Sequence, residues 1–157
     1  MTPQKSKEMK IRFIHQELNL CNDLKVYENM YLGEEITNKT GLVDKKAEIA
    51  RAQEVLDGMG VKISATALVA DLETAKKQLV EIAKALLFQS ELIIMDEPTT
   101  ALTKKEVNSL FKIILKLKEQ GIAILFISHK LNERSEGAGR QFYLYLPQNA
   151  GDIYDLR

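Results

Sequence analysis

The stretch LIIMDEP, residues 92–98, predicts the fold more directly than any other part of the chain. Four apolar residues in a row predict a strand that is buried on both faces, as in a parallel sheet covered by helices. Asp96 and Glu97 follow directly, and Pro98 ends the strand because proline has no N–H to donate. In open α/β sheets, ligands bind beyond the carboxyl ends of the strands. We therefore expect the two carboxylates to lie where a metal–nucleotide is handled.

A second apolar strand is predicted over residues 122–127, and His129 follows it closely. A helix is predicted between the two strands. Thr103 and Glu106 have the spacing of a capping box at its start, and Gly121 ends it. Strand, helix and strand in this order predict a βαβ unit with parallel strands, which places His129 near the two carboxylates if the strands are neighbours. The residues expected on the buried face of the helix are Val107, Leu110, Phe111, Ile114 and Leu117.

The remaining segments extend the α/β pattern. Helical spacing of apolar residues predicts a helix over 73–88, whose buried positions would be Ala75, Leu79, Ile82, Ala83 and Leu86. The other expected elements are a strand at 11–15, a short helix around Val26, Met30 and Tyr31, a helix over 44–59 capped by Asp44 and ended near Gly60, and a strand at 141–146.

Composition narrows the class of protein. The 157 residues suffice for a real core, and the 22 basic and 22 acidic side chains balance, so no nucleic-acid partner is expected. The single cysteine, Cys21, excludes an internal disulfide and fits a reducing cytosol. No stretch has the roughly 18 apolar residues of a membrane-spanning helix, so we expect no direct insertion into a membrane. The first ten residues do not resemble a secretion signal.

From residue 11 to about 133 the chain resembles the ATP-binding subunits of ABC transporters, most closely the monosaccharide (ribose/galactose-type) import ATPases of prokaryotes. Five pieces occur in the family's order, and together they are very specific. They are a Q-loop-like segment at 14–20, followed by 26–33; a signature-like segment at 72–78; the Walker B-like 92–97; a D-loop-like 99–103; and an H-loop-like 127–130. The fold that this resemblance implies is an α/β, partial P-loop NTPase (ABC ATPase) fold with parallel strands and a helical subdomain.

The resemblance also implies a role for each site residue. ATP hydrolysis depends mainly on positioning and on stabilising charge on the transferring phosphoryl group. Asp96 would hold Mg²⁺, with Gln16 as a second metal and nucleotide contact, and Glu97 would be the general base for the attacking water. His129 would bond the γ-phosphate. The signature-like residues, which would bind the ATP of a second subunit, are Leu72, Glu73, Thr74 and Ala75.

Partners and location follow from the same resemblance. The family's ATPases work as head-to-tail dimers with permease subunits, on the cytoplasmic, inner face of the prokaryotic cell membrane. We therefore expect permease subunits and a second ATPase subunit as partners, and ATP with Mg²⁺ as cofactors.

Three departures from the family pattern limit this reading. The phosphate loop G-x-x-x-x-G-K-[ST] is not found in the sequence, so we expect weak or absent ATP binding by this polypeptide alone. Glu73 stands where the family has a serine, and its carboxylate would repel a phosphate. After about residue 133 the resemblance stops. We therefore expect a partial ABC ATPase domain at 1–133, with a helical subdomain at about 42–88, and a divergent tail at 134–157.

Alternatives remain for the residues and for the chain. An acid pair at a strand end also serves as a helix cap or salt-bridge partner, and a histidine or glutamine by itself is usually structural. The chain itself is either a truncated sugar-importer ATPase, a non-catalytic remnant that pairs with a transporter or an intact ATPase, or one half of a site that another chain completes.

Overall fold

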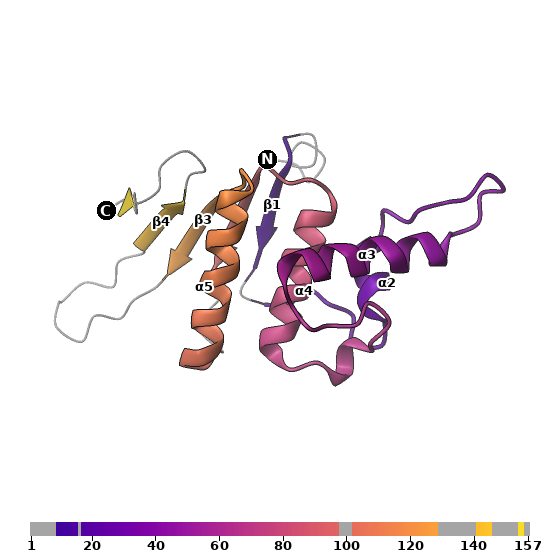
Figure 1. Ribbon diagram of the computed structural model, residues 1–157, viewed down its shortest axis with the longest axis horizontal. Coiled ribbons are helices and arrows are strands. Elements are labelled where there is room, and N and C mark those ends of the chain that lie inside the picture. Colours follow the sequence, from indigo (N-terminus) through magenta and orange to yellow (C-terminus); the bar gives the residue numbers. More distant parts are fainter. Residues whose placement is uncertain (1–8, 16, 98–101, 129–140, 146–153, 156–157) are drawn as a thin grey trace. The chain divides into compact units, whose positions relative to one another are not determined.

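The computed structural model describes residues 9–15, 17–97, 102–128, 141–145 and 154–155. The chain divides into two compact units. The first combines residues 1–17 with 90–157, and the second covers 18–89. Figure 1 shows helices and strands in the first unit and helices in the second. Each unit is described by itself.

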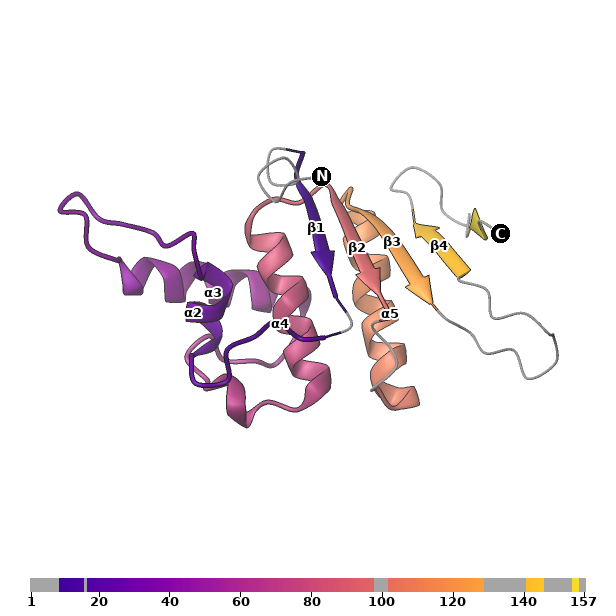
Figure 2. The same cartoon turned by 180° about the vertical axis from the view of Figure 1, so that it is seen from behind.

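The first unit is built on a sheet with the strand order β1-β2-β3-β4-β5. Its parallel part consists of β1 (Ile11–Ile14), β2 (Leu92–Asp96) and β3 (Ala123–Ser128), whose arrows run the same way in Figure 2. The predicted strands are confirmed, and β2 and β3 are neighbours, as the βαβ pattern requires. The sheet is not wholly parallel, however, because β4 (Gln141–Tyr145) pairs with β3 in the antiparallel direction, as does β5 (Tyr154–Asp155) with β4.

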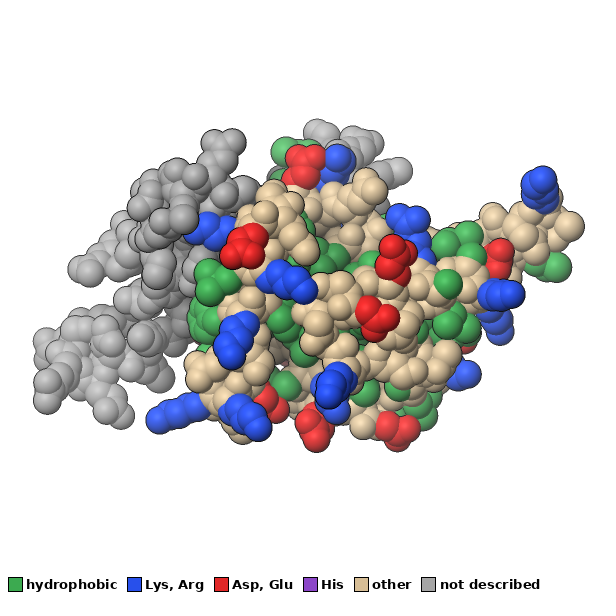
Figure 3. Space-filling view, in the orientation of Figure 1, with side chains coloured by type: hydrophobic (Ala, Val, Ile, Leu, Met, Phe, Trp, Pro, Cys, Tyr) green, Lys and Arg blue, Asp and Glu red, His purple; other side chains and the backbone are tan. Residues whose placement is uncertain are grey.

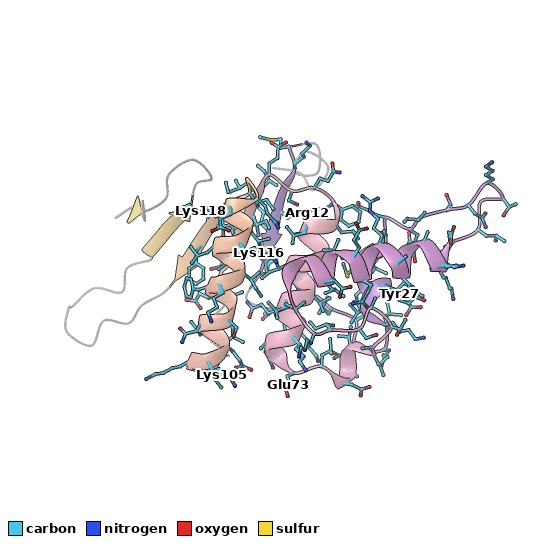
Figure 4. All side chains as sticks on the ribbon, viewed as in Figure 1. Arg12, Tyr27, Glu73, Lys105, Lys116 and Lys118 are labelled. Atoms are coloured by element: carbon cyan, nitrogen blue, oxygen red, sulfur yellow. The ribbon has the colours of Figure 1, made fainter. Side chains whose placement is uncertain are left out.

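Helix α5 (Lys104–Glu119) connects β2 to β3 and contacts β3. Its buried side chains are Leu110, Ile113, Ile114 and Leu117. The predicted face was therefore partly wrong, since Val107 and Phe111 are only half-buried and Ile113 replaces them. Phe111 still reaches the sheet, with its ring stacked 5.7 Å from that of Phe126. The side of α5 that faces solvent carries Lys105 and Lys116, which Figure 4 labels, and Figure 3 shows blue basic side chains over this helix.

The capping box predicted at the start of α5 is present. The Thr103 hydroxyl oxygen accepts a hydrogen bond from the Glu106 backbone N–H at 3.4 Å. In return, a Glu106 carboxylate oxygen accepts from the Thr103 backbone N–H at 2.7 Å and from its hydroxyl at 2.7 Å. These hydrogen bonds lower the pKa of Glu106 below its ordinary value of 4.5. The bond from the Thr103 hydroxyl has the larger effect, and the bond from the Thr103 backbone N–H adds to it.

Replacing Thr103 by alanine should destabilise the chain by about 0.5–2 kcal/mol at pH 7, as is typical of a lost helix cap. A carboxylate whose folded-state pKa is lowered stabilises the protein above its unfolded-state pKa and stops doing so as the pH falls through the folded-state pKa. The stability difference between wild type and Thr103→Ala should therefore shrink below the ordinary pKa of 4.5. Urea unfolding of both proteins at several pH values measures this difference in the free energy of unfolding. A difference that is the same at pH 7 and in acid would contradict the role given to Glu106.

The second unit packs three helices against one another: α2 (Val26–Tyr31), α3 (Lys45–Met59) and α4 (Thr74–Leu87). A 3-10 turn, η1 (Val69–Asp71), precedes α4. The predicted caps of α3 are confirmed, because the Asp44 side chain accepts from the Ala47 N–H at 3.1 Å and Gly60 has the left-handed φ of 74°. Fully buried side chains of this unit include Val26, Met30, Leu56, Val80 and Ile82.

The single apolar stripe predicted for α4 was only partly right. Ile82 and Ala83 are buried as expected, but the other three predicted positions are half-buried. The buried set spreads around the helix instead, because α4 is covered on more than one side. It consists of Gln78, Val80, Ile82, Ala83, Ala85 and Leu87.

No helix among the described residues combines the length and the apolar character needed to cross a membrane.

Candidate active site

The carboxyl ends of three neighbouring parallel strands meet at one edge of the sheet. Ile14, the last residue of β1, pairs with Met95 of β2, and Asp96 at the end of β2 pairs with Ile127 of β3. The Q-loop-like, Walker B-like and H-loop-like segments therefore leave adjacent strands in the same direction. This is the edge at which open α/β sheets bind ligands.

Asp96 and Glu97 lie at the centre of this edge. Met95, directly before them, is fully buried, whereas both carboxylate residues are half-buried. The two acidic residues thus follow a buried strand and are themselves partly exposed to solvent. A carboxylate in such a position keeps a fixed direction from the sheet while remaining able to meet a ligand or a water molecule.

The backbone of Glu97 is held in an unusual conformation. Its φ is 47°, in the left-handed region, which costs a residue other than glycine roughly 1–2 kcal/mol. Its backbone N–H donates to the Ile127 carbonyl oxygen at 2.8 Å, so the neighbouring strand fixes this turn. Strained backbone of this kind concentrates at functional sites. Lys10 and Gln89 have left-handed φ values as well, so the φ of Glu97 describes how its turn is built and does not by itself assign a function to it.

Two of the predicted site residues lie outside the described part of the chain. Gln16 comes two residues after the end of β1, and His129 comes one residue after the end of β3. Their roles stay predictions. His15, which precedes Gln16, is exposed, and its ring stacks on that of Phe13 with the centroids 6.1 Å apart.

The signature-like residues belong to the second unit. Glu73 is the N-cap residue of α4, but its side chain makes no cap hydrogen bond, and it is exposed (Figure 4). Thr74 is exposed as well, whereas Leu72 and Ala75 are half-buried. A carboxylate at a helix N-terminus suits the helix dipole. The structure places Glu73 at the start of α4, and its place in a signature motif and its effect on ATP stay predictions.

The described residues fit Mg²⁺ in the type of donor they offer. No group of three or more His, Cys, Asp or Glu side chains gathers into a metal site in the part of the chain that the structure describes. Mg²⁺ does not need such a group, because it usually keeps several waters and binds one or two carboxylates together with phosphate oxygens. Asp96, at the end of β2, offers one such carboxylate.

One residue of structural importance was missed at the sequence level. Asn29 lies in α2 among apolar neighbours and is 1% exposed. A polar residue within the apolar pattern of a short helix was the available signal, because a buried amide needs hydrogen-bond partners. Its contacts are described below.

The parallel strands and the helices that accompany them form the α/β fold of ATP-binding cassettes. Solved structures share this fold. The ADP conformation of an ATP-binding cassette of an ABC transporter matches 84% of this chain and 56% of its own, with a TM-score of 0.69 and 24% identity. The dimeric structure of a bacterial ABC transporter cassette matches 84% of this chain and 59% of its own, with a TM-score of 0.63 and 25% identity.

Sequence comparison gives the family. The ABC transporter family model matches residues 2–100, and the chain belongs to this family. It is 45% identical over 131 residues to the ribose import ATP-binding protein RbsA of Lactococcus lactis, and 42% identical over 131 residues to the protein of the same name from Bacillus licheniformis. Each match covers 83% of this chain and 27% of the relative, so the chain spans about a quarter of the length of these proteins.

Proposed function

We propose that this chain carries the metal-binding and water-activating part of an ATPase site in a prokaryotic ABC importer for a monosaccharide of the ribose type. The observation that carries the proposal is the shared edge of β1, β2 and β3, with Asp96 and Glu97 at its centre. The identity to two ribose import ATP-binding proteins supports the choice of substrate class.

Each residue has a distinct part in this proposal. Mg²⁺, when bound, would neutralise charge on the phosphates. Asp96 would hold the ion, and the Glu97 carboxylate would accept a proton from the attacking water. Gln16 would contact the metal and that water, and His129 would donate a hydrogen bond to the γ-phosphate. Residues 72–75 would meet the ATP bound by a second ATPase subunit.

Partners and location belong to the same proposal. Permease subunits of the importer and a second ATPase subunit would be the partners, and the complex would sit at the cytoplasmic face of the cell membrane. The dimeric cassette among the matched structures supports the pairing of ATPase domains. We also propose a partial ABC ATPase domain at 1–133 with a divergent tail at 134–157, although the tail adds β4 and β5 to the same sheet.

A non-catalytic module that pairs with a transporter or an intact ATPase is the second candidate. One observation favours it: Glu73 places a carboxylate at the start of α4. In this case the chain would keep the fold of the family without hydrolysing ATP.

An exchange of segments separates the two candidates. In the L. lactis relative, the 131-residue segment that matches this chain is replaced by residues 1–133, the proposed ABC ATPase domain, so that Gln16 and His129 are both included. We call this protein the grafted ATPase. The proposal predicts ATP hydrolysis that requires Mg²⁺ and falls to background when Glu97 of the graft is changed to glutamine. A folded graft whose hydrolysis rate equals that of its Glu97→Gln variant would reject the first candidate and favour the second.

A further inference from the structure

Two segments far apart in the sequence run side by side within the second unit. Residues 22–27 follow the Q-loop-like segment, and residues 65–70 lead into the signature-like segment. Lys25 and Leu68 form an antiparallel bridge between them. Four backbone hydrogen bonds of 2.9–3.0 Å join the segments on both sides of this bridge: Val26 N–H to Ala67 O, Tyr27 N–H to Ala65 O, Val69 N–H to Leu24 O, and Ala70 N–H to Asn22 O.

The Asn29 side chain locks the first of these segments. Its amide oxygen accepts from the Cys21 N–H at 2.8 Å, and its amide nitrogen donates to the carbonyl oxygens of Cys21 at 3.0 Å and Lys25 at 3.2 Å. Because Asn29 is 1% exposed, no water can replace these partners without a rearrangement. The lock thus fixes the turn that brings residues 22–27 beside residues 65–70.

A second tie reaches the helix that follows. The Lys77 ammonium, in the first turn of α4, donates to the Asn22 side-chain oxygen at 2.9 Å. The Leu72 N–H donates to the Val69 carbonyl at 3.1 Å, so the paired segment continues directly into the signature-like residues. Figure 4 labels Tyr27, which belongs to the first of these segments, and Glu73, which follows the second. We call residues 21–29 together with 65–72 the signature strap.

We propose that Asn29 and the Asn22–Lys77 pair are positioning residues that make the signature strap one body, so that residues 72–75 move together with residues 21–29. The meaning of residues 72–75 rests on the proposed function. The mechanical link does not, because its hydrogen bonds join residues of this chain alone. A test that needs no ATP therefore separates the failure of the link from the failure of the function.

Amide hydrogen exchange on the 157-residue chain measures the link. Removing a buried amide with three partners weakens local structure, and we expect Asn29→Ala to speed exchange at Val26 and Tyr27 at least about tenfold. The decisive amides are those of Val69, Ala70 and Leu72, which do not contact Asn29 and should speed up to a similar degree. In the Asn29→Ala chain, the amides of helix α3, in the same unit, should exchange at the wild-type rate. A control variant, Asn19→Ala, changes an exposed residue of the preceding loop and should leave the exchange rates of all these amides unchanged.

Faster exchange confined to residues 21–29 would overturn the proposal, and so would an equal rise throughout α3, which would mean general loosening of the unit. If Asn29→Ala does not fold, Lys77→Met provides the test, because it keeps the side-chain stem and removes the donor. It should speed exchange at Ala70, whereas Lys76→Met at the exposed neighbouring position should not.

Asn22→Asp tests the pair from its acceptor side and should not speed exchange. It offers the Lys77 ammonium a charged acceptor, and charge-assisted hydrogen bonds are stronger than neutral ones. Exchange at Ala70 should then be no faster than in the wild type, and Lys77→Met should remove the benefit. Faster exchange in Asn22→Asp with Lys77 intact would also overturn the proposed pairing.

Discussion

Changing Glu97 to glutamine in the grafted ATPase should lower kcat for ATP hydrolysis by about 10²–10⁴, the usual contribution of a general base. Glutamine has nearly the same shape, so the left-handed backbone and the hydrogen bond from its N–H to Ile127 should persist. ATP binding should change little, because the proposed role of Glu97 concerns the attacking water and not the phosphates. Steady-state hydrolysis and a nucleotide titration measure the two quantities separately.

Glu119→Gln is the matched control, because it makes the same chemical change at the exposed end of α5. It should leave both quantities as they are. A Glu97→Gln graft that hydrolyses ATP within a factor of about three of the unmodified graft would show that another group activates the water.

Changing Ile114 to alanine should lower the free energy of unfolding by about 2–5 kcal/mol, the usual cost of a large-to-small substitution in a core. Ile114 is fully buried in α5, the helix that connects β2 to β3 and packs on the sheet. The loss combines the transfer free energy of the removed atoms with the cavity they leave. Urea denaturation of the 157-residue chain, followed by circular dichroism, gives the change.

Leu115 provides the comparison within the same helix. It is 50% exposed, so Leu115→Ala removes a side chain of the same size from a position that leaves no buried cavity. Its effect should stay below about 1 kcal/mol, partly because alanine has the better helix propensity. Equal costs at the two positions would mean that α5 does not pack on the sheet through Ile114.

Most of the fold was predictable because its elements carry strong local signals. The apolar runs at 92–95 and 122–127 have few alternatives to buried parallel strands, and Thr103 with Glu106 marks the start of α5 independently of packing. Asp44 marks the start of α3 in the same way. For the site, a parallel sheet brings the carboxyl ends of neighbouring strands together, which is why the edge carrying Asp96 and Glu97 followed from strand order.

What the sequence did not predict depends on tertiary contacts. The antiparallel direction of β4 is a choice of pairing partner, which the pattern of residues 141–145 does not encode. The buried sides of α4 depend on what covers the helix, so one apolar stripe could not represent them. The left-handed backbone of Glu97 requires the Ile127 carbonyl on another strand, and the strap around Asn29 requires segments about 40 residues apart in the sequence to pair.

The most direct test of the carboxylate edge replaces Mg²⁺ by paramagnetic Mn²⁺ in the grafted ATPase with bound ATP, and observes isoleucine methyl resonances. The account predicts the strongest broadening at Ile14 and Ile127, which lie toward the carboxyl ends of β1 and β3. Ile11 and Ile122, at the amino ends, lie several residues away at about 3.3 Å per residue and should broaden far less. Stronger broadening at Ile11 and Ile122 than at Ile14 and Ile127 would contradict the assignment of this edge as the metal–nucleotide site.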